Sequence, residues 1–197
     1  KIKAGSGIGS SAASSAGAVA GINFLLGNPY TNKELIRFAM EGERLASGTA
    51  HADNVAPLLL GGFTLVRDCA TLDIIKLNTP LEIAASVIHP QIEVKTSDAR
   101  ALLKKKIPLK KAITQWANLG ALVSGLYEED YELISRSLED VIVEPIRSIL
   151  IPDFDALKEG CKKAGALGSG ISGSGPSVFA LSKGIFTAHK VAEAMKA

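Results

Sequence analysis

The sequence predicts an α+β fold in two domains, with a boundary near Asn78-Thr79-Pro80. Its 197 residues are 47% hydrophobic, enough to bury a core in one domain or in two small ones. Helical patterns dominate before the boundary. After it come a strand, several helices, a glycine-rich loop, a strand and a helix, which is the order of an α+β domain. We therefore expect domains at 1–79 and 80–197.

In the first domain, helical patterns occupy 10–26 and 31–46. The first is rich in Ala and Gly, which predicts close packing of its backbone, and it stops at Gly27-Asn28-Pro29. The second opens with Thr31 and Glu34, the two side chains of a capping box. A short apolar stretch at 58–60 follows, and after two glycines the pattern at 63–66 predicts a strand.

In the second domain, a strand is expected at 81–88, closed by His89-Pro90. Helices are expected at 97–105, 109–126, 130–143 and 155–164, with Trp116 as a helix core residue. A glycine-rich loop at 168–176 then leads to a strand at 177–181 and a last helix from Thr187. No internal repeat interrupts this order.

Charge and apolar run lengths argue against two kinds of partner, nucleic acid and membrane. The net charge of +2 is nearly neutral, and the lysines at 104–106 and 110–111 lack interleaved aromatic residues. They indicate a solvated face, and no nucleic acid is expected as a partner. The longest apolar runs are too short to cross a bilayer, so no membrane is expected. Cys69 and Cys161 match no metal or redox spacing, which favours two reduced thiols in a cytoplasmic protein.

The sequence begins and ends within expected secondary-structure patterns. Lys1 stands directly before an expected strand–loop–helix junction, and a first strand with no earlier partner could not complete a sheet. We therefore expect the true N-terminus to lie well upstream. The last residues fall inside a helical pattern, so we expect that C-terminal sequence is missing too.

The segment 5–13, Gly-Ser-Gly-Ile-Gly-Ser-Ser-Ala-Ala, follows an expected strand and leads into a helix. Glycines let the backbone approach a ligand closely, and a helix N-terminus adds free N–H donors and a positive dipole end. Phosphate is the natural guest of such a loop. It is no Walker A loop, because the Gly-Lys-Ser/Thr signature is absent. The alternative is an ordinary tight turn before a helix.

Helical periodicity puts Glu43 on the same face as the apolar stripe of Ile36, Ala39 and Met40. A buried ionised carboxylate is costly unless it is paired or bound to a metal. The sequence leaves two readings open, a salt bridge to Arg37 or Arg44, or a metal ligand. Glu41 projects from a different face of the helix.

The segment 47–57 gathers His51, Asp53 and Asn54 in one loop bounded by glycines. Such a cluster can be a capping arrangement, since Asp and Asn often only tie a turn. It can equally be a polar substrate site. Farther on, 168–173 spells G-x-G-x-x-G, but it joins a helix to a strand, whereas the dinucleotide fingerprint joins a strand to a helix.

The first glycine–serine loop resembles the phosphate-binding motif of the GHMP kinases (galacto-, homoserine, mevalonate and phosphomevalonate kinases), Pro-x-x-x-Gly-Leu-Gly-Ser-Ser-Ala. Lys3 replaces the proline and Ile8 the leucine. The resemblance implies a two-domain GHMP kinase fold, with a truncated N-terminal domain like domain 2 of ribosomal protein S5 and a ferredoxin-like C-terminal domain. It implies Mg²⁺ on Ser11 and Glu43. It also implies ATP phosphates on Lys3, Ala4, Gly5, Ser6, Gly7, Ile8, Gly9, Ser10 and Ser11.

Within that superfamily the loop at 47–57 resembles the homoserine kinases. The resemblance places Asp53 and Asn54 at the phosphoryl acceptor, and Asp53 is the one carboxylate offered as general base, although homoserine kinases lack a clear catalytic aspartate. Substrate contacts are implied for His51, Asn54, Thr96, Arg100, Arg147 and Gly173. Two of these are arginines, whose guanidinium groups bind carboxylates bidentately. Gly173 belongs to a loop at 170–176 that resembles the third GHMP motif, which packs near the phosphate loop.

The resemblance implies ATP- and Mg²⁺-dependent phosphorylation of the side-chain hydroxyl of L-homoserine, in threonine biosynthesis, by an enzyme that can form a homodimer. Two alternatives stay open: a GHMP kinase acting on another alcohol, and a non-catalytic relative that binds a small metabolite. Because the early strands and part of the adenine pocket would lie upstream of Lys1, we expect residues 1–197 alone to be inactive.

Overall fold

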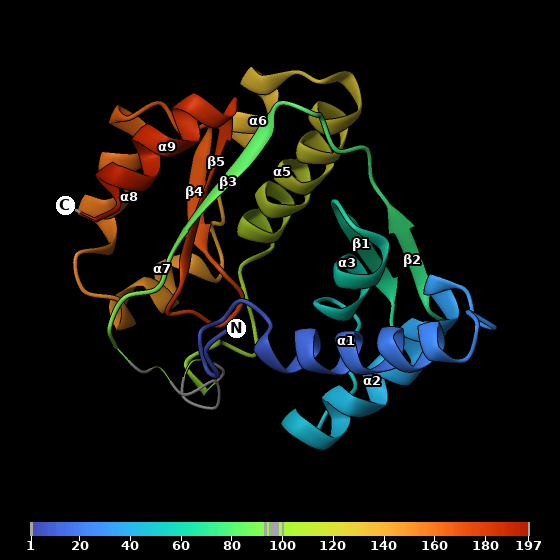
Figure 1. Cartoon of the computed structure of the whole chain (residues 1–197). Coiled ribbons are helices and arrows are strands. Elements are labelled where there is room, and N and C mark those ends of the chain that lie inside the picture. The colour runs from blue at the N-terminus through green and yellow to red at the C-terminus, as the bar shows by residue number, and fades with distance from the viewer. Residues whose placement is uncertain (1, 93, 95–98, 100, 197) are drawn as a thin grey trace. The chain divides into compact units, whose positions relative to one another are not determined.

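The structure is a computed structural model that describes residues 2–92, 94, 99 and 101–196. These residues divide into two compact units (Figure 1). The first unit holds residues 2–4 and 8–78, and the second holds Gly5–Gly7 together with the residues from Thr79 onward. The mixture of helices and sheets confirms the α+β class. The domain limits 1–79 and 80–197 stay a prediction.

The first unit packs three helices and a two-stranded sheet. Strands β1 and β2 form an antiparallel pair with a register shift between Val66 and Asp68. The helix at 10–26 and the strand at 63–66 are confirmed within two residues, whereas β2 has no counterpart among the predicted elements. The bounds are α1 (Ser10–Leu25), α2 (Asn32–Ser47), α3 (Val55–Leu60), β1 (Thr64–Asp68) and β2 (Asp73–Lys76).

Small side chains make the core of the first unit. Ala12 and Ala16 of α1 are 0% and 4% exposed, and they allow the backbone of α1 to pack closely on α2 and α3. This confirms the packing expected from the alanines. The other buried members of the cluster are Ile36, Ala39, Met40, Ala52, Val55 and Ala56.

The predicted capping box at the start of α2 is confirmed. The Thr31 hydroxyl accepts from the Glu34 N–H at 3.4 Å, and the Glu34 carboxylate accepts from the Thr31 N–H at 2.8 Å. That backbone N–H holds the pKa of Glu34 below its usual value. Asn23, buried in α1, exchanges two hydrogen bonds of 3.0 Å with the Tyr30 backbone and so fixes the turn between α1 and α2.

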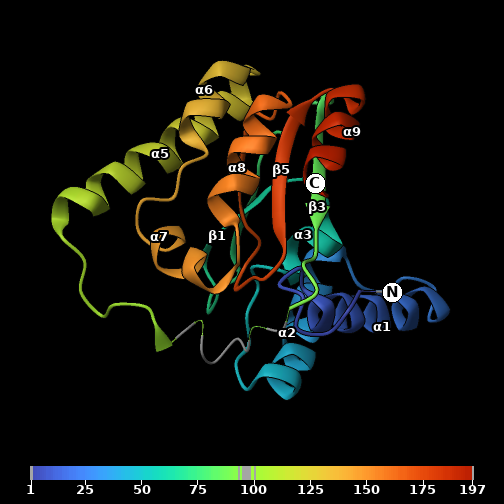
Figure 2. The ribbon, with the colours of Figure 1, turned by 90° about the vertical axis from the view of Figure 1, so that its left-hand side faces the viewer.

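The second unit is built on a three-stranded antiparallel sheet in the order β3-β5-β4. Helix α9 packs on β3 and β5, and α8 packs on β4 and on α9, so both cover one face (Figures 1 and 2). The bounds are β3 (Ile83–Ile88), α5 (Leu109–Glu128), α6 (Tyr131–Ser137), α7 (Glu144–Arg147), the 3₁₀ helix η1 (Ser148–Leu150), α8 (Phe154–Lys163), β4 (Gly168–Ile171), β5 (Val178–Lys183) and α9 (Ile185–Ala194).

The single helix predicted at 130–143 is wrong beyond Ser137. Asp130 caps α6 as a helix start should, accepting from the N–H groups of Glu132 and Leu133. Farther along, Asp140 turns the chain by accepting from the backbone N–H groups two and three residues ahead, those of Ile142 and Val143, at 2.8 Å each. An aspartate that bonds its neighbours' backbone in this way competes with helix formation, so the helix ends before it.

The glycine loop predicted at 168–176 is wrong in its first four residues, which form strand β4. Glycine is a poor strand former, but here the missing side chains make room for neighbours. A Cβ on Gly168 would lie 2.6 Å from the Leu138 Cβ, and one on Gly170 would lie 3.0 Å from Glu144 Oε2. Tertiary packing therefore decides the strand.

The strand predicted ahead of the first glycine loop is wrong for residues 2–4, which form no regular element. Of the helix predicted at 97–105, residues 97, 98 and 100 lie outside the described residues; Ala99 and Ala101 are helical, and the prediction is wrong for 102–105, which form no helix. The expectation that Trp116 is a core residue is wrong, because Trp116 is 63% exposed.

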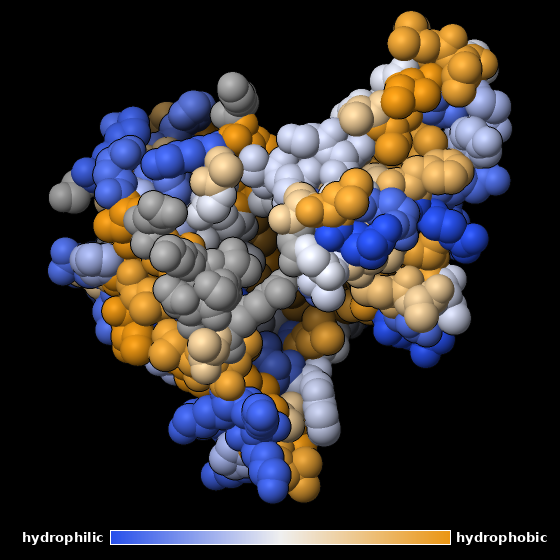
Figure 3. All heavy atoms as spheres, turned by 90° about the horizontal axis from the view of Figure 1, so that it is seen from below, coloured by the Kyte–Doolittle hydropathy of each residue, from blue (hydrophilic) through white to orange (hydrophobic). Residues whose placement is uncertain are grey.

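Apolar side chains reach the surface of both units. Leu25 of α1 is 83% exposed and Leu45 of α2 is 82% exposed. Figure 3 shows hydrophobic patches beside hydrophilic ones on the face drawn there. Among the helices of the described residues, none has the length and apolar character needed to span a membrane.

Candidate active site

The first glycine–serine loop has a backbone that only glycine adopts easily. Gly5, Gly7 and Gly9 have φ angles of +72°, +81° and +74°. Helix α1 begins directly after Gly9, and the Ala13 N–H donates to the Gly9 carbonyl at 2.8 Å. The N–H groups of the residues before Ala13 in this first turn precede any intrahelical partner, so they are available to an anion.

Asn54 lies against this loop within the first unit. A Cβ placed on Gly9 would come 3.3 Å from the Cβ, Cγ and Oδ1 atoms of Asn54. Asn54 stands at the N-terminus of α3 but makes no side-chain capping bond there. The side chain is therefore exposed next to the phosphate-type loop, and capping does not account for it.

The rest of the 51–54 loop is anchored from both sides. Ala52 and Val55 are 0% exposed and belong to the core, and the Ala56 N–H donates to the Ala52 carbonyl at 2.8 Å. Asp53 is exposed, and its Oδ1 accepts from the Asn54 N–H at 2.9 Å. His51 is half-buried. The core thus fixes the backbone that presents these polar side chains.

Glu43 is buried, as its periodicity predicted, with 5% of its surface exposed. Of the two arginines suggested as its partners, Arg44 instead pairs with Glu41 at 2.7 Å, on the exposed side of α2. That contact argues against a salt bridge between Glu43 and Arg44. The placement of Glu41 on a different face is confirmed by its 60% exposed side chain.

Helices α1 and α2 touch where Gly42 precedes Glu43. A Cβ on Gly42 would lie 2.8 Å from the Ser15 Cβ, so α1 passes close to this point of α2. Ser11 stands one helical turn before Ser15 and is half-buried. The two predicted metal ligands, Ser11 and Glu43, therefore lie at or beside the same helix interface.

A hydroxyl and a carboxylate are hard oxygen donors, the type that Mg²⁺ prefers, and Mg²⁺ needs few of them because it keeps water and phosphate oxygens. The two residues thus fit this ion by donor chemistry. Across the described part of the chain, no group of three or more His, Cys, Asp or Glu residues is arranged to hold a metal.

In the second unit, the residues Gly5–Gly7 pack on the glycine-rich loop that precedes β5. The Ser172 hydroxyl donates to the Gly7 carbonyl at 2.9 Å, and the Ser177 N–H donates to the Ser6 carbonyl at 3.1 Å. A Cβ on Gly7 would lie 2.6 Å from the carbonyl oxygens of Ser172 and Gly175. The expected packing of the two glycine loops is confirmed.

Arg147 is held by backbone carbonyls. Its Nη1 donates to the Gly173 carbonyl at 2.8 Å, and its Nε donates to the Ala99 carbonyl at 3.4 Å. Two residues of the predicted substrate set, Arg147 and Gly173, are thereby in contact, and both line a cavity of about 250 Å³. The other two predicted in this unit, Thr96 and Arg100, lie outside the described residues.

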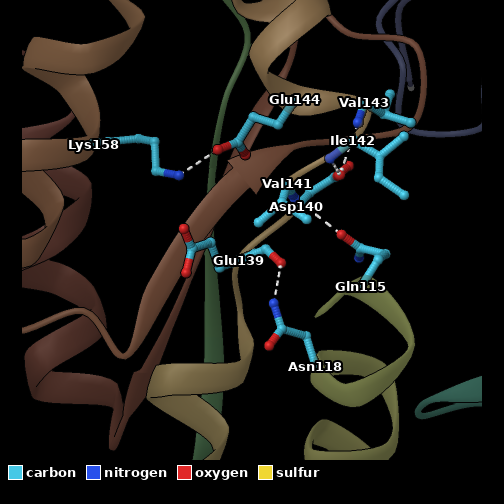
Figure 4. A network of polar contacts seen from close by, with 9 residues as sticks. All are labelled: Gln115, Asn118, Glu139, Asp140, Val141, Ile142, Val143, Glu144 and Lys158. Carbon is cyan, nitrogen blue, oxygen red and sulfur yellow. Dashed lines mark hydrogen bonds and ion pairs between the residues drawn. The ribbon is translucent and has the colours of Figure 1, made fainter. Parts of the chain in front are cut away.

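Sequence reasoning missed the polar groups that surround the helix of Arg147. Glu144 and Lys158 form an ion pair, and Asp140 and Gln115 bond the backbone just before that helix (Figure 4). Glu144 stands three residues before Arg147, a predicted substrate contact, which was the one available signal. Nothing local in the sequence indicates Lys158 as its partner.

The chain matches two family models. Residues 1–62 match "GHMP kinases N terminal domain" and residues 122–197 match "GHMP kinases C terminal".

Curated relatives match along nearly the whole chain. A homoserine kinase of Chloroherpeton thalassium is 54% identical over 191 residues, which is 97% of this chain and 60% of the relative. A homoserine kinase of Pyrococcus furiosus is 44% identical over 196 residues, 99% of this chain and 65% of the relative. The chain thus spans about 60% of the length of the first of these.

Solved structures of two kinases superpose on this chain. A homoserine kinase from Cytophaga hutchinsonii superposes with a TM-score of 0.96 at 56% identity, covering 100% of this chain and 62% of that one. A mevalonate kinase of L. major has a TM-score of 0.75 at 16% identity, with 95% and 61% covered. The second likeness shows a shared fold only.

Proposed function

Because this chain belongs to the GHMP kinase family, with the N- and C-terminal domains of that family, we propose that the protein transfers the γ-phosphoryl group of ATP to the side-chain hydroxyl of L-homoserine. The product is O-phospho-L-homoserine. Relatives named homoserine kinase, 44% to 54% identical over nearly the whole chain, support this substrate.

The contact between Gly9 and Asn54 carries the proposal. It brings a loop of the homoserine kinase type against the loop that resembles a phosphate site, inside one compact unit. An acceptor hydroxyl near Asn54 would then be close to a phosphoryl group held at the N-terminus of α1. Holding both reactants in position is the main source of catalysis in phosphoryl transfer, whose transition state is loose.

In the proposed reaction, the homoserine hydroxyl oxygen forms a bond to the γ-phosphorus while the bond to the oxygen bridging to the β-phosphate breaks. ADP leaves with that electron pair, and the Asp53 carboxylate accepts the hydroxyl proton. The N–H groups of the first glycine loop and of the start of α1 bind the β- and γ-phosphates. Ser11 and Glu43 would hold Mg²⁺, which when bound neutralises the charge that develops on the phosphates.

The homoserine carboxylate is assigned to Arg147, whose guanidinium is oriented by its hydrogen bonds to the Gly173 and Ala99 carbonyls. A guanidinium has five N–H donors in a fixed planar arrangement, which suits it to bind a carboxylate. His51 and Asn54 are assigned to the remainder of the substrate, as are Thr96 and Arg100.

A coupled assay of ADP release tests the proposal in the full-length protein. L-homoserine should give turnover that depends on ATP and Mg²⁺, whereas mevalonate and galactose should give none. Turnover with another alcohol and none with homoserine would contradict the substrate assignment. Calorimetric titration with ATP, with and without Mg²⁺, distinguishes an enzyme from a non-catalytic metabolite binder.

The same proposal puts the protein in the cytoplasm, as a step of threonine biosynthesis. The homodimer that the resemblance implies stays a prediction, and light scattering on the full-length protein tests it.

A further inference from the structure

Arg147 is the last residue of a helix that is too short to be stable without contacts to other elements. Helix α7 has four residues, Glu144–Arg147, with no side-chain cap at its start. An isolated helix of that length is unstable in water, so its orientation must come from contacts with other elements. The direction in which Arg147 points therefore depends on what holds α7.

The segment leading into α7 is tied to α5 by side chains (Figure 4). Gln115 Oε1 accepts from the Val141 N–H at 2.9 Å, and Asn118 Nδ2 donates to the Glu139 carbonyl at 2.9 Å. Asp140 then closes the turn through the two backbone N–H groups described above. These bonds fix where α7 begins, but none of them reaches the helix itself.

Glu144 ties the first turn of α7 to two further elements. Its side chain is 13% exposed, and Lys158 Nζ of α8 donates to its Oε1. The other oxygen, Oε2, lies against strand β4, where a Cβ on Gly170 would come within 3.0 Å of it. The carboxylate is therefore held between Lys158 on one side and the backbone of Gly170, which has no side chain, on the other.

Glu144 and Arg147 are three residues apart, which puts them on neighbouring positions of one helical turn. Rotation of that turn about its axis would move both side chains together. At the far end of the turn, Arg147 donates to the Gly173 and Ala99 carbonyls. Two clamps on a single turn define one orientation of the guanidinium.

We infer that Glu144 is a positioning residue: held by Lys158 and seated on Gly170, it sets the rotation of α7 and so the orientation in which Arg147 meets the substrate carboxylate. This inference rests on the proposed function, in which Arg147 binds that carboxylate. A purely structural ion pair between Glu144 and Lys158 would instead affect stability and leave substrate binding unchanged.

Steady-state kinetics of the full-length protein test the inference. Glu144→Gln keeps the shape of the side chain but weakens the bond to Lys158, and it should raise the KM for homoserine about tenfold while the KM for ATP stays within about twofold. Glu159→Gln is the matched control, since Glu159 also pairs with a lysine on α8 but is 57% exposed. It should change neither constant.

Coupling to Arg147 separates positioning from stability. In an Arg147→Ala background, Glu144→Gln should add less than about twofold to the homoserine KM, because its effect passes through Arg147. A full tenfold increase on top of Arg147→Ala would overturn the inference. So would a Glu144→Gln variant that leaves the homoserine KM unchanged while Arg147→Ala raises it.

Lys158 gives a second route if Glu144→Gln does not fold. Lys158→Met should reproduce the rise in the homoserine KM, and Lys158→Arg should restore the normal value by keeping the ion pair. Equal KM values for these two variants would contradict the inference. If Arg147→Ala itself leaves the homoserine KM unchanged, the carboxylate assignment under the proposed function fails, and the inference fails with it.

Discussion

Ser15 of α1 occupies the space beside Gly42 of α2, so that a Cβ on Gly42 would lie 2.8 Å from the Ser15 Cβ. This close approach is possible because Gly42 has no side chain. It brings α1 against α2 at the residue just before the buried Glu43, and several testable consequences depend on that geometry.

Gly42→Ala should push α1 and α2 apart and destabilise the protein by about 1–3 kcal/mol, the usual cost of overpacking a close contact. Gly17→Ala is the control, because Gly17 lies within α1 and a Cβ there meets nothing within 4 Å. It should stabilise the helix by up to about 1 kcal/mol. Urea unfolding of the two variants measures the difference, and equal stabilities would contradict the packing described.

Gly9→Ala should weaken ATP binding with a smaller effect on the fold. The φ of Gly9 is +74°, a conformation that costs other residues about 1–2 kcal/mol, and the new methyl group would press on Asn54. We expect the KM for ATP to rise about tenfold. Kinetics and thermal unfolding should be measured together, and an unchanged KM would contradict a phosphate role for this loop.

Glu43→Gln distinguishes a metal ligand from a structural salt bridge. As a ligand, its loss should raise the Mg²⁺ concentration needed for half-maximal activity by about tenfold, with stability nearly unchanged. As a buried salt-bridge partner, its loss should cost about 3–5 kcal/mol and leave the Mg²⁺ requirement unchanged. Glu41→Gln is the control on the exposed side of α2, where both quantities should stay normal.

Asp53→Asn tests the general base. If Asp53 takes the hydroxyl proton, kcat should fall at least about a hundredfold, because Asn cannot accept that proton in its place. Asn can still accept the hydrogen bond from the Asn54 N–H, so the loop should keep its shape. A kcat close to normal would show that the reaction proceeds without this base.

The two cysteines should differ in reactivity. Cys161 is 0% exposed, and burial raises the pKa of its thiol, so little reactive thiolate forms at neutral pH. Cys69 is half-buried, and both thiols are free. Mass spectrometry after brief iodoacetamide treatment at pH 8 should find Cys69 modified first. Equal modification of the folded protein would contradict the burial of Cys161.

The raised pKa of the Cys161 thiol also predicts how the stability of the fold changes with pH. The folded state holds the Cys161 proton more tightly than the unfolded state does. Its contribution is therefore fully present below the unfolded thiol pKa of about 8.5 and is lost as the pH rises through the folded value. Unfolding midpoints of the wild type and Cys161→Ala from pH 7 to 10 should converge as the pH increases.

Local patterns predicted much of the first unit. The capping box of Thr31 and Glu34 depends on residues three positions apart, and the burial of Glu43 follows from helical periodicity. Both are visible in the sequence because the interacting groups are neighbours along one helix. The α+β class followed in the same way from the order of elements.

Features decided by distant contacts were not predictable. Gly168–Ile171 forms a strand because β5 pairs with it and Leu138 fills the space beside Gly168. Trp116 lies on an apolar helix pattern, but periodicity does not say which side of a helix is covered, and this residue is 63% exposed. The backbone partners of Arg147 and the pairing of Glu144 with Lys158 likewise join residues far apart in the chain.

Phosphorus NMR of the reaction mixture tests the central claim most directly. The full-length protein, incubated with MgATP and L-homoserine, should produce ADP and, in equal amount, a phosphate monoester on the homoserine side-chain oxygen. Release of inorganic phosphate with no such monoester, or no change in the ATP signals, would contradict the account.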